Sequence, residues 1–375
     1  MWLDEKVTRD NWINRSLPGS SLQTFLFEQQ STSSVSFDAV RRYMNVIHYH
    51  RKPLPRYFSV ERLFADIRGA FPADINCKVI VSRYPSQGVL PRIFNTLEAA
   101  FRQGDVNHIT GDVHFLVLLL KKKKTLLTVL DCGIVTRRPK GIGRSLLKLF
   151  WYTLPVRRCA VVAAISEFTK TELIELTGCD AERVRVVHVP LGKSFQPSPR
   201  PFRLECPRLL HLGTSDNKNL DRSIEALKGI PCHLHIVGNP SSAQRAALDR
   251  NGIAYTADAS LTDDQVLEAY RDCDVVLFPS TYEGFGMPII EGQAIGRVVV
   301  AGNVCSMPEV AGGAACLVDP FDVQAIRAGV VRVIEDPEYR AELIHKGFVN
   351  AARFSPASIA AQYAQIYREL ESASK

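Results

Sequence analysis

The sequence lacks any long apolar run and any paired-cysteine motif. No stretch approaches the roughly 20 consecutive apolar residues that a membrane-spanning helix requires. Asp4, Glu5 and Arg9 stand where a secretory signal peptide would be apolar and uninterrupted. The nine cysteines, from Cys77 to Cys316, include no CxxC pair, and their odd number argues against a closed disulfide framework. We therefore expect a cytoplasmic protein with reduced thiols.

The composition is that of a globular protein with room for two domains. Of the 375 residues, 46% are hydrophobic and 23% are charged, which fits neither a disordered chain nor a membrane bundle. A single hydrophobic core seldom organises more than about 250 to 300 residues. The formal net charge of +7 suits a partner that carries phosphates, whether a nucleotide, a nucleic acid or an anionic membrane face. The charge alone does not choose among these partners.

Short apolar segments alternate with helical segments along two stretches of the chain. This pattern is typical of a parallel sheet buried on both faces. The proline-rich segment 190–201 separates the two stretches, so we expect an α/β protein with two Rossmann-like domains, at residues 41–200 and 201–355. Residues 1–40 are expected to be an N-terminal extension, and residues 356–375 a C-terminal helix with one apolar stripe. The expected strands are 44–49, 77–81, 106–109, 125–130, 184–189, 208–212, 233–237 and 275–278; the expected helices are 59–71, 91–102, 113–120, 220–227, 241–250, 262–271 and 356–370.

The segment 280–291 reads STYEGFGMPIIE and follows directly after the apolar strand that ends at Phe278. Two glycines allow the backbone to come close to a ligand, and Pro288 favours the first turn of a helix. The free amides at that helix start can bind an anion. Seven residues separate Glu283 from Glu291, so both carboxylates can face one crevice. The alternative is a solvent-exposed helix start with two unrelated acids.

This segment resembles the Glu-x7-Glu motif of the family-four retaining glycosyltransferases, the bacterial group 1 type with the GT-B fold. The resemblance implies that Glu283 lies beside the donor sugar and that Glu291 binds the ribose hydroxyls. It also implies a nucleotide-sugar donor domain at 201–355, an acceptor domain at 41–200 and a cleft between them. The C-terminal helix would then cross back onto the first domain. The implied donor-binding residues are Gly213, Thr214, Lys218, Gly284, Phe285, Gly286, Met287, Pro288 and Glu291.

The segment 211–227, HLGTSDNKNLDRSIEAL, looks like the phosphate loop of the same family. By this resemblance Gly213 and Thr214 end a strand, and Lys218 reaches the donor phosphates. Thr214 stands where many relatives carry an arginine. Lys218 can alternatively be a lysine that helps to cap a helix start. With Glu283 and His114, Lys218 completes the set of residues predicted to be catalytic.

The first domain offers candidates for acceptor binding. The resemblance points to Gly88, in a loop where relatives often have paired glycines. It also points to Asp131: many relatives have His-Asp at this strand end, whereas this chain has Leu130 and Asp131. His114 can act as an acceptor ligand or proton shuttle, because an unperturbed imidazole titrates near pH 6.5; it can equally be a capping histidine. His108, within a strand, is predicted to be a hydrogen-bonded core residue. The stretches similar to one bacterial branch of the family are 106–116 and 165–173.

No metal ion and no cofactor are expected. Asp272, Cys273 and Asp274 spell the DxD pattern with which another glycosyltransferase architecture binds a divalent metal. They lie where a helix ends and a buried strand begins, which is behind the expected crevice. No other group of His, Cys or acidic residues has metal-ligand spacing. The nucleotide sugar is expected to be a substrate.

A basic and apolar stretch covers residues 137–158, after the four lysines 121–124. It can lie on an anionic membrane surface with Phe150 and Trp151 inserted, which would make the protein peripheral on the inner face of the plasma membrane. It can equally be a basic helix that packs Leu147 and Trp151 into the domain core. Nucleic acid is not an expected partner, because no recognised binding motif accompanies the charge.

These features predict transfer of a sugar from a nucleotide donor to a hydroxyl of a glycan or lipid-linked acceptor, in surface polysaccharide biosynthesis. The nucleoside diphosphate would leave through a cation-like transition state, and the helix start and Lys218 would stabilise the departing charge. By the resemblance, the hydroxyl attacks on the face that the phosphate leaves. Two alternatives remain open: a nucleotide-sugar epimerase without an acceptor site, and a catalytically silent nucleotide-sugar-binding subunit.

Overall fold

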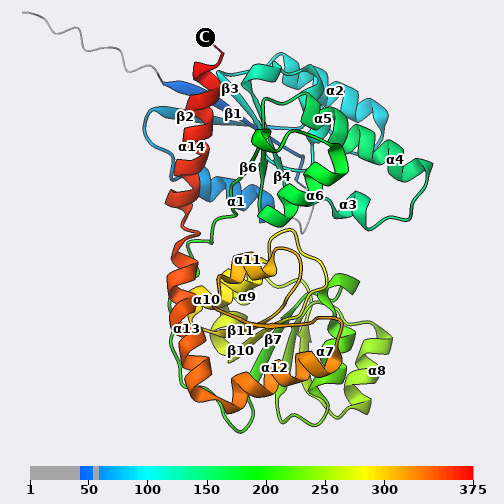
Figure 1. Ribbon diagram of the computed structural model, residues 1–375, viewed down its shortest axis with the longest axis vertical. Coiled ribbons are helices and arrows are strands. Elements are labelled where there is room, and N and C mark those ends of the chain that lie inside the picture. The colour runs from blue at the N-terminus through cyan, green and yellow to red at the C-terminus, as the bar shows by residue number, and fades with distance from the viewer. Residues whose placement is uncertain (1–42, 54–58, 375) are drawn as a thin grey trace, which may run out of the picture. The chain divides into compact units, whose positions relative to one another are not determined.

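The computed structural model describes residues 43–53 and 59–374. The extension predicted for residues 1–40 lies outside these residues. Two six-stranded parallel sheets organise the chain, each with helices on its faces (Figure 1). This arrangement confirms the expected α/β fold with two Rossmann-like units. Over the described residues no helix is both long and apolar enough to span a bilayer.

The first sheet has the strand order β2-β1-β3-β4-β5-β6. Its central strands consist of apolar side chains with almost no exposure, such as Val46, Leu127 and Val162, because helices cover both faces. The strands are β1 (Met44–His50), β2 (Ile75–Val81), β3 (Val106–Ile109), β4 (Thr125–Val129), β5 (Val161–Ala164) and β6 (Val184–Val186). The helical elements are α1 (Ser59–Arg68), α2 (Val89–Ala100), η1 (His114–Leu119), η2 (Lys122–Lys124), α3 (Gly133–Thr136), α4 (Ile142–Lys148), η3 (Leu149–Thr153), α5 (Leu154–Arg157), α6 (Glu167–Thr177) and η4 (Ala181–Arg183).

The second sheet has the order β12-β11-β10-β7-β8-β9. Val276, Leu277 and Val299 are completely buried in it. The strands are β7 (Arg208–Leu212), β8 (His233–Val237), β9 (Ala254–Asp258), β10 (Val275–Phe278), β11 (Val298–Gly302) and β12 (Cys316–Val318). The helical elements are η5 (Asp216–Lys218), α7 (Leu220–Leu227), α8 (Ser242–Arg250), α9 (Asp263–Asp272), α10 (Met287–Ile295), α11 (Met307–Ala311), α12 (Val323–Glu335) and α13 (Pro337–Ala352).

Both sheets have a point where the strand order reverses. In the first sheet, β1 and β3 are neighbours, and the chain continues outward from each of them in opposite directions. In the second sheet, β7 and β10 occupy this position. Ligands of such sheets bind beyond the carboxyl ends of the strands at the reversal. The loops that follow these four strands are therefore the places to look for a site.

The C-terminal helix α14 (Pro356–Ser372) packs against the first sheet, as expected for a helix that crosses back (Figure 1). The hydroxyl of Tyr367, in this helix, lies 2.9 Å from Nε2 of His48 and 2.7 Å from Nδ1 of His108. The other ring nitrogen of His108 lies 2.7 Å from Oγ1 of Thr128. His108 is thus a hydrogen-bonded core residue, as predicted. Ile359, Tyr363 and Leu370 complete the buried stripe of the helix.

The clearest departures among the predicted elements are over residues 113–120 and 184–189. Residues 113–120 form the 3-10 helix η1 and not an α-helix, because short connectors between strands commonly take this tighter form. The strand expected over 184–189 ends at Val186. Beyond that residue only Val187 continues the ladder, with its amide donating to the Ala164 carbonyl at 2.9 Å.

Candidate functional site

The segment between β7 and α7 folds tightly across the carboxyl end of β7. Gly213 has a φ of +90°, and a β-carbon there would lie 2.9 Å from Cγ of Lys218. Glycine therefore allows the Lys218 side chain to lie back over the end of the strand. Asn219 donates from Nδ2 to the carbonyl oxygens of Pro279 and Pro320, at 2.9 and 2.6 Å. These bonds fasten the loop to the neighbouring strand end.

The ammonium group of Lys218 pairs with Glu283. Nζ lies 2.7 Å from Oε1 of Glu283 and 4.8 Å from the ring centroid of Phe278. The side chains of the two charged residues are 22% and 15% exposed, so the pair is sheltered but can be reached from outside. An ion pair with this limited exposure can rearrange to receive an anionic ligand, whose phosphate would compete with Glu283 for the lysine.

The loop that carries Glu283 is held by polar contacts on both sides. The buried hydroxyl of Ser306 lies 2.9 and 2.7 Å from the carbonyl oxygens of Glu283 and Phe285. Asn217 donates from Nδ2 to the carbonyl of Tyr282 at 3.1 Å. The position of the Glu283 carboxylate is thus set by residues from two other loops.

Helix α10 begins directly after this loop. Gly286 precedes it with a φ of +106°, Pro288 stands in its first turn, and that turn carries no acidic residue. Pro288 has no amide hydrogen and the Ile289 amide donates to the Gly286 carbonyl at 3.0 Å, so Met287 is the residue of this first turn whose amide can meet an anion. The Phe285 ring is only 4% exposed and packs against Phe354 with ring centroids 5.6 Å apart. Phe285 thus belongs to the core, and its backbone is the part that borders the crevice.

Glu291 lies one turn into α10, where its Oε2 accepts a 2.5 Å hydrogen bond from the Tyr270 hydroxyl. Burial raises the pKa of Glu291 to about 7, against the opposing effects of the Tyr270 bond and of the Lys218 charge. Because the Lys218 charge lowers the pKa of Glu291, Glu291 interacts electrostatically with the Lys218–Glu283 pair. A carboxylate whose pKa is raised in this way accepts hydrogen bonds strongly once it is ionised.

Gly284 lies where the loops of the two sheets meet. Its carbonyl oxygen accepts a hydrogen bond from the Ser166 hydroxyl at 2.7 Å, and a β-carbon at this position would collide with the carbonyl oxygen of Leu130. The neighbouring Tyr282 hydroxyl donates to Oε2 of Glu172 at 2.7 Å. The close approach that requires glycine here is therefore to the first sheet.

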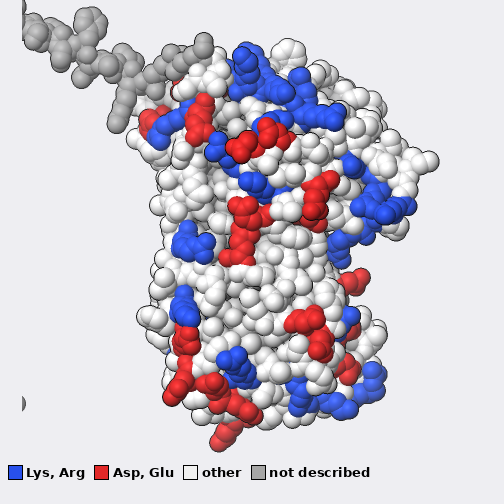
Figure 2. All heavy atoms as spheres, in the orientation of Figure 1, with Lys and Arg blue, Asp and Glu red and all other residues white. Residues whose placement is uncertain are grey.

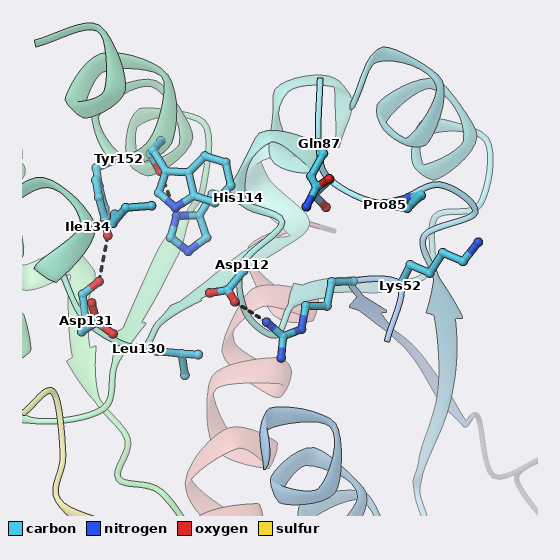
Figure 3. A pocket seen from close by; sticks show the side chains of 12 residues that line it. Lys52, Pro85, Gln87, Asp112, His114, Leu130, Asp131, Ile134 and Tyr152 are labelled. Carbon is cyan, nitrogen blue, oxygen red and sulfur yellow. Dashed lines mark hydrogen bonds and ion pairs between the residues drawn. The ribbon is translucent and has the colours of Figure 1, made fainter. Parts of the chain in front are cut away.

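A cavity of about 340 Å³ lies at the carboxyl ends of β1, β3 and β4 (Figure 3). Nη1 of Arg51, after β1, donates to Oδ2 of Asp112, after β3, at 2.6 Å. Asp131 follows β4. The mixture of carboxylates, an amide and aromatic rings suits a polyhydroxylated ligand, which needs both hydrogen-bond partners and apolar contact. The lining residues are Arg51, Lys52, Pro85, Ser86, Gln87, Asp112, His114, Leu130, Asp131, Ile134, Trp151 and Tyr152.

His114 begins η1 and lies at this cavity with only 3% of its surface exposed (Figure 3). Nδ1 lies 2.8 Å from the carbonyl oxygen of Trp151, and because a carbonyl only accepts, Nδ1 carries the proton. Burial lowers the pKa of His114, while the Trp151 carbonyl and Asp112 act in the opposite direction. The ring is neutral near pH 7, and Nε2 can accept a proton from a ligand hydroxyl.

A second hollow, of about 440 Å³, adjoins the cavity and extends to the second sheet. Asp131 and Ile134 line both spaces, and Asn217, Glu283 and Gly284 line the far side of the second hollow. Burial raises the pKa of Asp131, and the Glu283 charge adds to the rise. The two hollows therefore adjoin at Asp131 and Ile134, and the second one reaches Glu283 of the Lys218–Glu283 pair. Arg137, Arg138, Gly133 and Tyr282 complete the lining.

Two predicted residues lie at the margin of these spaces. Gly88 has a φ of +84° and precedes α2; its neighbours Ser86 and Gln87 line the cavity, whereas Gly88 does not. Thr214 donates from its hydroxyl to the carbonyl of Asn239 at 3.2 Å. Among the other residues predicted to bind the donor, Gly284 lines the second hollow. Gly213, Lys218, Phe285 and Gly286 lie in the segments after β7 and β10, and Met287, Pro288 and Glu291 lie in α10.

The sequence analysis did not identify several residues that line the site. Arg51 and Asp112 follow β1 and β3, so their position after apolar strands was a usable signal. Trp151 was predicted to insert into a membrane or to pack into the domain core. Its side chain packs against the core of the first sheet and also lines the cavity. Arg137 gave no signal beyond its charge.

The two aspartates of the DxD pattern form ion pairs with arginine side chains. Asp272 contacts Arg200, Arg203 and Arg208, and Oδ2 of Asp274 lies 3.0 Å from Nη1 of Arg203. The pattern follows α9 at the amino end of β10, opposite to Glu283. Across residues 43–53 and 59–374 no group of three His, Cys or acidic side chains is arranged to hold a metal ion.

Comparison with known proteins agrees with this geometry. The family model of the glycosyl transferases group 1 matches residues 200–349, the part that holds the Lys218–Glu283 pair. Over these residues the chain is similar to the group 1 glycosyl transferases. This result confirms the family resemblance inferred from the motifs.

Two relatives from Escherichia coli are mannosyltransferases. The chain is 28% identical over 229 residues to the serotype-specific mannosyltransferase WbdA, which is 54% of this chain but only 28% of WbdA. It is 28% identical over 237 residues to the O-antigen chain mannosyltransferase B, covering 56% of this chain and 61% of that protein. The alignments therefore span less than two thirds of either relative.

The fold agrees with that of a solved structure. HepE from Anabaena, crystallised with UDP-glucose, superposes with a TM-score of 0.69 at 16% identity, covering 87% of this chain and 100% of HepE. Together with the two facing sheets, this similarity identifies the GT-B fold.

Proposed function

We propose that this protein moves a mannosyl residue from a nucleotide sugar to a hydroxyl of a glycan or lipid-linked acceptor, with retention of configuration. The observation that carries the proposal is that the His114 cavity and the hollow that reaches Glu283 adjoin at Asp131. A donor and an acceptor can meet where the two hollows adjoin. The names of the two E. coli relatives support mannose and surface polysaccharide biosynthesis.

The donor belongs at the loops after β7 and β10. In this proposal Lys218 leaves Glu283 to contact the diphosphate, and the Met287 amide at the start of α10 receives the second phosphate. Glu291 accepts hydrogen bonds from the ribose. Charge develops on the departing diphosphate in the transition state, so Lys218 acts there more strongly than in the ground state. No metal ion takes part.

The acceptor belongs in the cavity of the first sheet. Asp112 and Asp131 orient its hydroxyl groups, and the attacking hydroxyl approaches the anomeric carbon from the face that the diphosphate leaves. The departing phosphate oxygen takes the proton, and Nε2 of His114 accepts a hydrogen bond from a neighbouring hydroxyl. We propose that the reaction takes place in the cytoplasm, at the inner face of the membrane.

Release of nucleoside diphosphate tests this function. UDP-, GDP- and ADP-sugars, including those of mannose, are offered with and without bacterial membrane extract, beside Glu283→Ala. Release that depends on the extract and is lost in Glu283→Ala supports transfer, and the anomeric configuration of the product tests retention. Release or epimerisation without an acceptor would indicate a hydrolase or epimerase, and nucleotide binding without turnover a silent subunit. Unchanged rates after chelation test the absence of a metal.

A further inference from the structure

Helix α2 directs its apolar side chains away from the domain. The residues that it buries are small or polar, namely Asn95, Thr96 and Ala99. Its large apolar residues recur every four positions in two adjacent rows, which places them on one face of the helix. Their exposed fractions are 71% for Val89, 69% for Leu90, 49% for Ile93, 58% for Phe94, 44% for Leu97 and 88% for Phe101, which directly follows the helix.

The segment formed by α4 and η3 has a similar outward face. Ile142, Leu146, Leu149 and Phe150 repeat at helical spacing and are 82%, 50%, 38% and 57% exposed. Leu147 and Trp151 lie on the other side and pack against the core of the first sheet. The segment therefore packs with one face and leaves a second apolar face open. The core packing expected for Leu147 and Trp151 is confirmed, and of the two residues predicted to enter a membrane only Phe150 is exposed.

The two apolar faces belong to neighbouring elements. The Arg92 guanidinium of α2 lies 5.3 Å from the ring centroid of Trp151 in η3. Leu119 of η1, 48% exposed, adds another outward apolar side chain in the element that packs against α2. An exposed apolar area of this extent marks an interaction site.

The charge on the α4–η3 side of this surface has one sign. Residues 132–166 contain seven Lys and Arg and no Asp or Glu. Figure 2 shows Lys and Arg gathered at the position that α3 and α4 occupy in Figure 1, beside uncharged surface. Arg137, Arg138 and Lys140 are exposed, and Arg144 and Lys148 are half-buried. A second copy of the chain would bring like charges together, whereas an anionic surface would neutralise them.

We propose that α2 and the α4–η3 segment form a docking surface for a membrane with anionic lipids. The apolar rows enter the boundary between headgroups and acyl chains, and the basic residues contact the headgroups. The surface adjoins the cavity, because Ser86 and Gln87 line it just before α2, and Ile134 and Trp151 line it beside α4. A docked enzyme would hold this cavity at the membrane, where the headgroup of a lipid-anchored acceptor can enter it.

Flotation with lipid vesicles tests the docking surface without donor or acceptor, so the result does not depend on the proposed transfer reaction. The full chain is mixed with vesicles of phosphatidylcholine containing phosphatidylglycerol, and with vesicles of phosphatidylcholine alone. We expect binding to the anionic vesicles that weakens as salt is raised, because salt screens exposed charges. Equal binding to both vesicle types, or binding to neither, would overturn the proposal.

Two variants separate the apolar and the basic contributions. Leu90→Glu with Phe94→Glu should weaken vesicle binding by at least about tenfold, because two buried apolar side chains are lost. Lys140→Gln, Arg144→Gln and Lys148→Gln together should weaken it by on the order of a hundredfold, since each base near an anionic bilayer contributes roughly fivefold.

A matched control carries the same kind of change elsewhere. Leu204→Glu with Val349→Glu alters residues of the second half that are 64% and 67% exposed, and it should bind vesicles like the parent chain. All variants should keep the parent's thermal unfolding midpoint, because the altered side chains are exposed or half-buried. Vesicle binding that survives Leu90→Glu with Phe94→Glu would overturn the proposal. A dimer in sedimentation that becomes monomeric in this variant would also overturn the proposal, because the apolar face would then bind a second copy of the chain.

Discussion

The ammonium nitrogen of Lys218 lies 2.7 Å from Oε1 of Glu283, although 65 positions separate the two residues. The neighbouring positions of β7 and β10 in the second sheet make this contact possible, because each residue follows one of these strands. The pair joins the cation that an anionic leaving group needs to the carboxylate that faces the second hollow. It is the central element of the proposed donor site, and the first prediction concerns it.

Removing the Lys218 charge should slow release of the nucleoside diphosphate. A charge-assisted hydrogen bond contributes roughly 1.5 to 3 kcal/mol, so Lys218→Met should lower kcat/KM by about ten- to a hundredfold. Lys346→Met removes an exposed lysine from α13 and serves as control. A rate in Lys218→Met within about twofold of the parent would contradict the assigned role.

Donor affinity should depend on pH through Glu291, whose pKa is raised to about 7 by burial. If its carboxylate accepts hydrogen bonds from the ribose, affinity should rise by up to about tenfold between pH 6 and pH 8, as the group loses its proton. Calorimetric titration with nucleoside diphosphate measures this dependence. In Glu291→Gln the affinity should be lower at pH 8 and nearly constant across the range; a parallel pH dependence in both proteins would exclude Glu291 as its source.

The two ring nitrogens of His114 can be tested separately. Asparagine places an amide nitrogen near Nδ1, so His114→Asn should keep the bond to the Trp151 carbonyl and lose Nε2. We expect kcat for transfer to fall by about tenfold, because a neutral hydrogen bond contributes roughly 0.5 to 1.5 kcal/mol, with unchanged donor affinity and thermal stability. His114→Gln, which places its amide near Nε2, should retain more activity than His114→Asn. The reverse order would contradict the proposed role of Nε2.

The Tyr367 hydroxyl should stabilise the crossing of α14 onto the first sheet. Tyr367→Phe removes the partner of two buried imidazoles, those of His48 and His108, and should lower the free energy of unfolding by about 2 to 4 kcal/mol. Urea denaturation measures the change. Tyr363→Phe removes one longer contact, 3.2 Å to Thr128, and should cost less. Equal losses in the two variants would indicate that the histidine contacts contribute nothing.

Stability should fall as the solution becomes acidic. Burial lowers the pKa of His48 and His108 well below 6.5, and that of His50 and His211 to about 4. Below pH 6.5 the unfolded chain therefore binds protons that the folded chain does not, and the free energy of unfolding decreases toward pH 4. The raised pKa values of the Glu291, Asp131 and Glu172 carboxyls act in the opposite direction over part of this range, whereas the lowered pKa values of His114 and His233 add to the loss of stability. A free energy of unfolding that stays constant from pH 7 to pH 5 would contradict this account.

The strands were predicted most accurately where polar residues, glycine or proline flank an apolar run. Strands 106–109, 208–212, 233–237 and 275–278 have the predicted bounds, because polar residues, glycine or proline stand beside their apolar runs. β11 was not predicted, since its apolar run almost continues that of α10. β9 is an edge strand with alternating half-exposed residues, and β12 has only three residues, so neither has a distinctive pattern.

The sequence alone determined the family, the pair of parallel sheets and the location of the Lys218 and Glu283 loops. These features depend on contiguous segments, in which strand, turn and helix start follow one another within about a dozen residues. The tertiary structure decided which strand ends are neighbours, and therefore that Arg51 meets Asp112 and that Nδ1 of His114 faces a carbonyl. It also decided the direction of the apolar face of α2. Helical periodicity shows that apolar residues share one face, but the packing of the rest of the chain determines whether that face points to the core or to solvent.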